Sequence, residues 1–340
     1  NGLLFAQANP GNYNYKYLTI RDGLCDNSIR AIYKDKNSFM WFGTSNGLDR
    51  YDGYELKHYS ASSHFLHQFI ESNYINDIKE DENRNLWVAS EAGITRINLL
   101  QEDIEYFKDY SGENGDILST PVKTIYLDDL GNLWVGKSDC LAYAVLTAEG
   151  NIADIHIIKR NVEINAIVKH GNDIWAGGVG NLARFITSTR NDYTGMHVDV
   201  DFEASSLAFN CLLSYGDYLW FGTQSGLYCH HSQNKILDVY QHDLHNANRT
   251  SSNFITEISK NSSGDIIIGT RNGVNIYSRN DRFAAFQKSP FAKSLNDNMV
   301  NKIFVDENDN IWVGSDFGGI NILTPQYITF LHELQGYEKG

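Results

Sequence analysis

Two pairs of histidines have the side chains and the spacing to bind a metal ion. His64 and His67 form one pair, and His242 and His245 form the other, each ahead of an apolar segment. Imidazole nitrogens bind Zn²⁺, but neither pair is accompanied by a cysteine or a third ligand at a defined spacing. We therefore interpret both pairs as solvated loop residues and expect neither a metal nor another cofactor.

Two acidic stretches resemble the start of a calcium-binding loop. Residues 81–85 and 306–310 both read D-x-N-x-N, as in an EF-hand. Such a loop also needs glycine at its sixth position, where this chain has Leu86 or Ile311. Aspartate and asparagine side chains favour tight turns. These stretches are therefore interpreted as turns between strands.

Other signs of catalysis or nucleic-acid binding are weak. The sequence contains no P-loop and no H-E-x-x-H motif, so no catalytic residue is assigned. The formal net charge is −14, which provides no basic surface for nucleic acid. The cysteines form no C-x-x-C pair and are expected to be free thiols. They are Cys25, Cys140, Cys211 and Cys229.

A repeat built on tryptophan organises the chain. Each of the six tryptophans follows an apolar residue, and five of them are followed two residues later by glycine. A seventh copy has isoleucine at the tryptophan position, and successive copies are 41 to 47 residues apart. Apolar stretches and polar turns recur around each copy in the same order. The residues expected to form the core are Trp41, Trp87, Trp134, Trp175, Trp220, Ile267 and Trp312.

Each copy is long enough for four short strands separated by turns, which predicts a four-stranded antiparallel meander. One such sheet has two apolar faces and buries neither alone, so successive sheets must stack around an axis. The sequence therefore predicts an all-β, seven-bladed β-propeller of four-stranded antiparallel blades. Residues 15–20 or residues 328–331 have the pattern to complete the last blade. We expect the amino-terminal segment to do so, because it joins both chain ends in one blade.

Residues near the strand ends are candidates for ligand binding. An asparagine recurs 14 residues before the core position in four copies, where the chain turns inward. Our first interpretation is a turn former that satisfies the backbone, and the alternative is a ring of amides that binds sugar hydroxyls. Basic residues that do not recur from copy to copy are the other candidates for ligand binding. The candidates are Asn27, Arg30, Asn73, Lys137, Asn253, Arg271 and Asn298.

The ends of the chain suggest its organisation. Residues 3–8 read LLFAQA, which is similar to the end of a secretory signal with small residues at −3 and −1. We expect residues 1–8 to be a signal remnant, 9–14 a leader, 15–324 the propeller and 325–340 an exit strand or linker. The sequence has no run of 18 apolar residues of the kind that spans a membrane.

From about Tyr15 to Thr324 the repeat resembles the two-component regulator propeller repeat. The resemblance is carried in the first copy by Asp22-Gly23-Leu24, Asn27-Ser28-Ile29 and residues 40–53, and it is weaker in the fourth and fifth copies, whose first hairpins are shorter. It implies the periplasmic sensor region of a hybrid two-component system from glycan-degrading gut bacteria. Such chains also hold a second propeller, an immunoglobulin-like domain, a membrane helix, a histidine kinase and a DNA-binding regulator.

The resemblance implies a function for this region. It would be a non-enzymatic sensor module that binds, or helps bind, a glycan-derived oligosaccharide outside the cytoplasm, within a homodimeric inner-membrane receptor. Residues 325–340 would lead to the second propeller. Two alternatives remain: a metal-dependent propeller lyase or hydrolase similar to streptogramin lyases, with the histidine loops as its site, and a scaffold or dimerisation propeller that binds no ligand.

Overall fold

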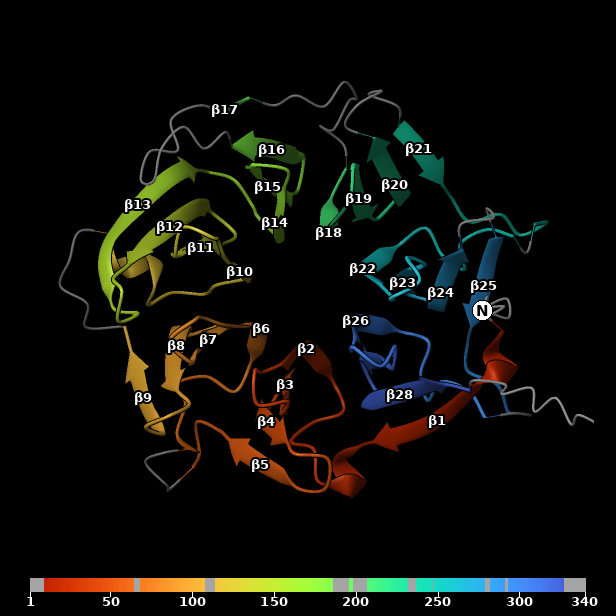
Figure 1. The fold of residues 1–340 in the computed structure, drawn as a ribbon, viewed down its shortest axis with the longest axis horizontal. Helices are drawn as coiled ribbons and strands as arrows, with labels where there is room; N and C mark the ends of the chain where they lie inside the picture. Colours follow the sequence, from red (N-terminus) through yellow and green to blue (C-terminus); the bar gives the residue numbers. More distant parts are fainter. Residues whose placement is uncertain are drawn as a thin grey trace, which may run out of the picture.

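The chain folds into a ring of β-sheets (Figure 1). The computed structural model describes residues 9–63, 68–107, 114–185, 196–197, 207–231, 237–246, 248–278, 282–290 and 293–326. Within these ranges there is no α-helix, and no helix is long and apolar enough to cross a membrane. The 3-10 turns of this part of the chain are Pro10–Asn12, Ile20–Asp22 and Gly115–Ile117.

Seven sheets of antiparallel strands make up the ring, each with four strands. We number the blades from one to seven in the order of their first, innermost strands. Blade one holds β2 (Ile29–Lys34), β3 (Met40–Thr44), β4 (Gly47–Tyr51) and β5 (Leu56–Tyr59); blade two holds β6 (Ile75–Glu80), β7 (Asn85–Ser90), β8 (Gly93–Asn98) and β9 (Asp103–Tyr106); blade three holds β10 (Thr124–Leu127), β11 (Asn132–Gly136), β12 (Cys140–Leu146) and β13 (Ile152–Arg160).

The remaining blades repeat this order, except that blade seven takes its outer strand from the start of the chain. Blade four holds β14 (Ala166–His170), β15 (Asp173–Gly178), β16 (Asn181–Phe185) and β17 (Met196–His197); blade five holds β18 (Phe209–Tyr215), β19 (Tyr218–Thr223), β20 (Gly226–His231) and β21 (Leu237–Tyr240); blade six holds β22 (Ile255–Lys260), β23 (Ile266–Thr270), β24 (Gly273–Ser278) and β25 (Arg282–Phe286); blade seven holds β26 (Val300–Val305), β27 (Ile311–Ser315), β28 (Ile320–Pro325) and β1 (Tyr13–Leu18).

Blade four departs from the regular pattern. Its outer strand β17 has two residues and pairs with β16 at two positions, whereas every strand of the other six sheets has at least four residues. The expectation of seven complete four-stranded blades is therefore corrected: six blades are complete, and blade four has only a two-residue outer strand. Residues 186–195, which separate β16 from β17, are almost all polar. Only Ile186 and Tyr193 among them carry large hydrophobic side chains, so this segment supplies little apolar surface to bury against a neighbouring blade.

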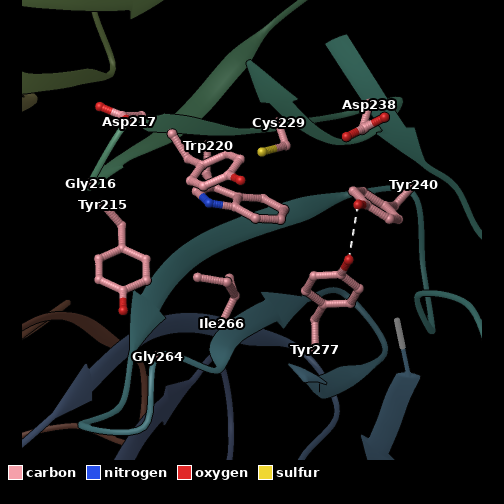
Figure 2. Close-up of a pocket in the computed structure, with 11 residues that line it drawn as sticks. Tyr215, Gly216, Asp217, Trp220, Cys229, Asp238, Tyr240, Gly264, Ile266 and Tyr277 are labelled. Atoms are coloured by element: carbon pink, nitrogen blue, oxygen red, sulfur yellow. Dashed lines mark hydrogen bonds between the residues drawn. The ribbon is translucent and has the colours of Figure 1, made fainter. Parts of the chain in front are cut away.

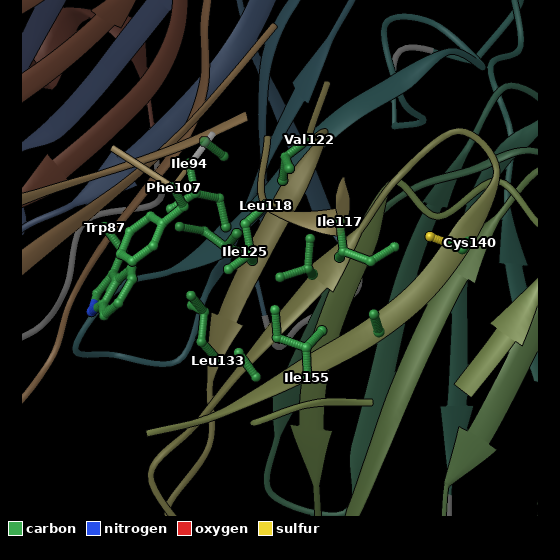
Figure 3. Close-up of a cluster of buried hydrophobic side chains, with 14 residues drawn as sticks. Trp87, Ile94, Phe107, Ile117, Leu118, Val122, Ile125, Leu133, Cys140 and Ile155 are labelled. Carbon is green, nitrogen blue, oxygen red and sulfur yellow. The ribbon is translucent and has the colours of Figure 1, made fainter. Parts of the chain in front are cut away.

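The core position of each blade is buried against the next blade around the ring. Trp87 of blade two, for example, packs with Ile125 and Leu133 of blade three (Figure 3). Burial of such large apolar surfaces is what holds successive sheets together. The seven core residues, all at most 9% exposed, are Trp41, Trp87, Trp134, Trp175, Trp220, Ile267 and Trp312.

Glycine two residues after the core position allows neighbouring blades to approach. A Cβ atom on Gly43 would lie 2.6 Å from Cγ2 of Ile75 in blade two, and one on Gly314 would lie 2.5 Å from Cγ2 of Ile29 in blade one. Side chains do not tolerate contacts that short, so these two positions require glycine, whereas blade two accommodates Ala89 at the equivalent position.

The amino-terminal strand closes the ring, as predicted. β1 pairs with β28 over its whole length, from Tyr13 opposite Pro325 to Leu18 opposite Ile320. The strand begins within the stretch expected as a leader. Residues 1–8, expected as a signal remnant, and the alternative closing segment 328–331 lie outside the described residues. Blade seven therefore contains both ends of the described chain.

Candidate functional site

The four recurring asparagines lie at the junctions between blades. Each Oδ1 atom accepts a hydrogen bond of 2.6–2.9 Å from the backbone N–H of the second residue after the preceding outer strand. These side chains therefore fix the loop that connects one blade to the next, which is the turn-forming role expected first. Their binding of a ligand stays a prediction. The pairs are Asn27 with Ile20, Asn73 with Ala61, Asn253 with His242 and Asn298 with Lys288.

Two basic candidates are engaged within the protein. Lys137 is buried, and its Nζ donates to the backbone oxygen of Thr120 at 3.1 Å and to Oγ1 of the same residue at 2.6 Å. Burial lowers the pKa of this ammonium group. Arg271 forms an ion pair with Asp316 at 3.1 Å, and its guanidinium lies 5.1 Å from the ring centroid of Phe254. Both side chains have structural partners in the described chain.

Arg30 lies on an innermost strand, in a ring of side chains that join the blades. Its Nε donates to Oδ1 of Asn76 at 3.4 Å, and its guanidinium lies 4.2 Å from the ring centroid of Tyr74. Five inner strands have a bulge at this position, which redirects the side chain there. Bulged asparagines use their amide to donate to a backbone oxygen of the next blade. These bonds are Asn76 to Val122, Asn210 to Ile255 and Asn301 to Ile29.

The histidine pairs contribute little to a site. His64 and His67 lie outside the described residues. Nδ1 of His242 is hydrogen-bonded to the backbone oxygen of Thr250 at 2.7 Å, so this ring stabilises its own loop. Within the described ranges, one group of three His, Cys or acidic side chains has its ligand atoms within 4.8 Å of one another. It consists of Cys25, Asp49 and His58, in blade one.

One serine has the sequence context of a nucleophile but not the structural context. Residues 43–47 read G-x-S-x-G, a motif in which serine serves as a nucleophile on a strand-to-helix turn. Here Ser45 lies in the hairpin between β3 and β4, and its Oγ donates to Oγ of Ser28 at 3.0 Å. The motif therefore forms an ordinary hairpin turn in this fold.

The acidic turns hold the core tryptophans. Oδ1 of Asp81 accepts the backbone N–H groups of Asn83 and Asn85, and its Oδ2 accepts the indole N–H of Trp87. The carboxylate is thus occupied by the turn and the core, as expected for a turn former. The same indole bond recurs at 2.8–3.0 Å in four blades, where it joins Trp41 to Asp35, Trp87 to Asp81, Trp134 to Asp128 and Trp312 to Asp306.

Blade five lacks this aspartate. Its first hairpin is so short that Tyr215 pairs directly with Tyr218, and Ser214 stands six residues before the tryptophan. Nε1 of Trp220 is consequently buried without a hydrogen-bond partner. Leaving a buried donor unsatisfied costs about 1–3 kcal/mol. An acceptor atom brought to this point by a bound molecule, once the side chains over the N–H move aside, would recover part of that free energy.

A pocket of about 660 Å³ opens beside this indole, between blades five and six (Figure 2). Its volume lies within the range of about 300–1,000 Å³ that is typical of small-molecule sites. The hydroxyls of Tyr240 and Tyr277, one from each blade, are hydrogen-bonded at 3.0 Å across the seam. The lining residues are Tyr215, Gly216, Asp217, Tyr218, Trp220, Cys229, Asp238, Tyr240, Gly264, Ile266 and Tyr277.

The lining combines aromatic rings with two carboxylates. The indole of Trp220 stacks on the ring of Tyr240 at 6.0 Å and lies 5.7 Å from that of Tyr277. Asp217 and Asp238 are exposed, so their carboxylates can accept hydrogen bonds from a ligand that also meets solvent. Burial, aided by Asp238, raises the pKa of the Cys229 thiol to about 12, so this thiol stays protonated at neutral pH. The lining suits a polar ring without negative charge.

The sequence-based candidates do not line this pocket. Asn253 precedes β22, whereas the pocket includes Gly264 and Ile266 beyond the other end of that strand. The pocket therefore opens at the opposite end of the strands from the asparagine junctions. The shortened hairpin of the fifth copy, which lacks the aspartate of copies one, two, three and seven, is the sequence signal that marks it.

Comparison with known proteins supports the resemblance seen in the sequence. The model of the two-component regulator propeller matches residues 23–46 and 294–317, at the start of blade one and in blade seven, which confirms the resemblance there. Among curated proteins, none matches this chain.

Solved structures share the fold at low sequence identity. The extracellular domain of a hybrid two-component system from B. thetaiotaomicron is 22% identical with a TM-score of 0.73, over 92% of this chain and 42% of that one. A second such domain from the same organism is 22% identical with a TM-score of 0.71, over 92% of this chain and 39% of that one. The chain therefore spans about two fifths of these structures. Virginiamycin B lyase from Staphylococcus aureus is 14% identical with a TM-score of 0.64, over 92% of this chain and 98% of that one.

Proposed function

We propose that this chain is the extracytoplasmic sensor module of a hybrid two-component receptor, because residues 23–46 and 294–317 match the model of the two-component regulator propeller. It would be the periplasmic part of an inner-membrane protein whose remaining chain includes a second propeller, an immunoglobulin-like domain and a histidine kinase. A ligand shifts such a receptor only through unequal affinity for its two signalling states. The receptor is expected to act as a homodimer, so that rearrangement of the two sensor modules reaches the kinase.

We propose further that the module binds a glycan-derived oligosaccharide in the pocket between blades five and six. The observation that carries this is the buried, unpartnered indole N–H of Trp220 beside the pocket. Aromatic faces such as that of Tyr277 can stack on the apolar face of a sugar ring, while Asp217 and Asp238 can accept hydrogen bonds from its hydroxyls. The two carboxylates and the net charge of −14 disfavour sulfated or uronate-rich ligands.

A lyase is the second function that similar folds perform. An enzyme similar to streptogramin lyases would need a metal-binding histidine that faces the central channel. No histidine stands at the bulged position of the inner strands or at the equivalent position of blades three and four. The residues there are Arg30, Asn76, Lys123, Asn165, Asn210, Thr256 and Asn301. The sensor is therefore favoured over the lyase.

Trp220→Phe tests the pocket because it removes the indole N–H and keeps an aromatic ring. If that N–H donates to the ligand, the affinity for the best neutral oligosaccharide should fall about tenfold, the equivalent of ~1.4 kcal/mol. Calorimetric titration of the wild type against neutral, amino and acidic oligosaccharides identifies that ligand first. The variant is then titrated with the same compound.

Trp87→Phe is the matched control. It leaves Asp81 without its indole partner and should lower the free energy of unfolding by about 1–3 kcal/mol, while ligand affinity stays unchanged. Trp220→Phe loses no hydrogen bond within the protein and should cost less stability. Equal ligand affinity in wild type and Trp220→Phe would exclude this pocket. Absence of binding across the panel, together with binding by a longer chain, would favour the scaffold alternative.

A further inference from the structure

A second cluster of polar side chains lies in blade one, well apart in sequence from the pocket. Cys25 precedes β2, Asp49 lies on β4 and His58 lies opposite it on β5. Nδ1 of His58 is 2.6 Å from Oδ1 of Asp49 and 3.4 Å from Sγ of Cys25. Asp49 is fully buried, whereas 47% of the His58 side chain is exposed. The sulfur, nitrogen and oxygen atoms of these three side chains thus lie close together, and the imidazole ring borders solvent.

Blades six and seven show which part of this cluster the fold requires. The residues equivalent to Asp49 are Asn275 and Asn321, both fully buried. Each accepts a backbone N–H from the loop before its blade, that of Ser251 or Asn296, just as Oδ2 of Asp49 accepts the N–H of Cys25 at 2.9 Å. An amide serves this backbone bond as well as a carboxylate does, so the fold does not explain the acid at position 49.

The two other members of the cluster also differ from their equivalents. Opposite Asn275 stands Ala285, and opposite Asn321 stands Tyr17, where blade one has His58. The residue that donates to Asn275 is a serine, where blade one has Cys25. Relative to blade six, blade one therefore has a thiol, a carboxylate and an imidazole in place of a hydroxyl, an amide and a methyl group.

The cluster brings three potential metal-ligand atoms close together. One nitrogen, Nδ1 of His58, faces both the thiol and the carboxylate, and it carries either one proton or one lone pair. A nucleophilic cysteine is disfavoured, because burial and the Asp49 carboxylate raise the pKa of the Cys25 thiol. A metal ion uses all three atoms as ligands at once.

We propose that Cys25, Asp49 and His58 form a Zn²⁺ site in which Sγ, Oδ1 and Nδ1 are the protein ligands and the fourth position faces solvent. Thiolate, imidazole and carboxylate are zinc ligands, whereas Mg²⁺ and Ca²⁺ prefer oxygen alone. Zinc bonds of about 2.0–2.3 Å hold ligand atoms roughly 3.2–3.8 Å apart. The exposed His58 ring has to move less than about 1 Å from Asp49 to reach this spacing.

The surroundings support the ligand geometry. Oδ2 of Asp49 is held by the backbone N–H of Cys25, so Oδ1 is the oxygen that faces the other two ligands. Such outer hydrogen bonds orient metal ligands and are a regular part of zinc sites. The ion would tie the segment that leads from β1 into blade one to the outer strand of that blade. Zinc should therefore stabilise the ring near its closure.

The repeat itself supplies the variants that test this site. Cys25→Ser, Asp49→Asn and His58→Ala each install the residue type found at the equivalent position of blade six, so the fold should tolerate them. Asn275→Asp, which gives blade six a carboxylate without the other ligands, is the matched control. Binding is measured on the untagged chain by calorimetric titration with ZnCl₂ and by metal analysis after dialysis.

The wild type and Asn275→Asp should bind one equivalent of zinc, and each of the three blade-one variants should lose at least about tenfold in affinity. Co²⁺ should give a thiolate charge-transfer band in the wild type, which Cys25→Ser abolishes and Cys140→Ser retains. Zinc should also raise the melting temperatures of the wild type and of Asn275→Asp, and it should leave those of the three blade-one variants almost unchanged. Equal zinc affinity in wild type and Asp49→Asn, or a cobalt spectrum without the thiolate band, would overturn the proposal.

Discussion

Trp41→Ala should lower the free energy of unfolding by about 3–5 kcal/mol, the usual effect of truncating a buried tryptophan to alanine. Trp41 is fully buried and packs with Ile75 and Ile78 of blade two, so the cavity falls at an interface between blades. The change also deprives Asp35, which is only 4% exposed, of the indole N–H that its Oδ2 accepts at 2.9 Å. Both effects act on the folded state alone.

Urea unfolding followed by tryptophan fluorescence and by circular dichroism measures this loss. Tyr54→Ala is the control, because Tyr54 is also aromatic but 94% exposed, and its removal should change stability by no more than about 0.5 kcal/mol. At temperatures where Trp41→Ala remains folded, its affinity for a ligand of the blade five pocket should match the wild type. A loss of less than about 1 kcal/mol would show that the blade interface does not depend on this position.

The ring was predictable because every copy of the repeat meets the same physical requirement. A tryptophan strand that is apolar on both faces must be covered on both, and only stacking of like sheets provides that cover. Blade four meets this requirement in its core strand and departs from the pattern only in its two-residue outer strand. The recurring asparagines illustrate the same rule. A residue that returns with the repeat, such as Asn73 or Asn298, performs the same backbone task in each blade.

The pocket depends on an aspartate that is missing from blade five, and the regular repeat of the sequence does not reveal the effect of that absence. Ser214 replaces the aspartate that would hold the indole of Trp220, and the consequence is visible only with blade six in place. Tyr240 and Tyr277 meet across two blades at a separation of 37 residues. The side chains that form the pocket therefore come from different copies of the repeat, and the sequence alone does not show which of them lie side by side.

The cysteine cluster was missed for a related reason. Zinc motifs are recognised by short, fixed spacings between ligands, whereas Cys25 and Asp49 are 24 residues apart and Asp49 and His58 are nine apart. Their proximity follows from strand register, in which Asp49 stands opposite His58. Comparison of equivalent positions between blades would have singled them out, because all three differ from their counterparts in blade six.

Removal of residues 9–22 should lower the melting temperature by about 10 °C or more. The deletion takes away β1, which pairs with β28 at six positions and contributes the buried side chain of Leu18. The ring of Tyr13, which packs edge-on against Phe286 at 5.2 Å, is lost as well. A loss of about 3–5 kcal/mol corresponds to this shift, since 1 kcal/mol moves the midpoint by roughly 2–4 °C in chains of 150–250 residues. Differential scanning calorimetry measures it.

Asn14→Ala is the control for this deletion, because Asn14 lies on β1 with an exposed side chain and its loss should move the midpoint by no more than about 2 °C. The truncated chain also leaves β28 as an unpaired edge, which is prone to pair with another chain. A synthetic peptide of residues 9–22 should therefore bind the truncated chain and restore much of its thermal stability. The same peptide with Leu18→Asp should not, because its strand would place a charge in the core of blade seven. An unchanged melting temperature after the deletion would mean that the ring does not depend on β1 for its closure.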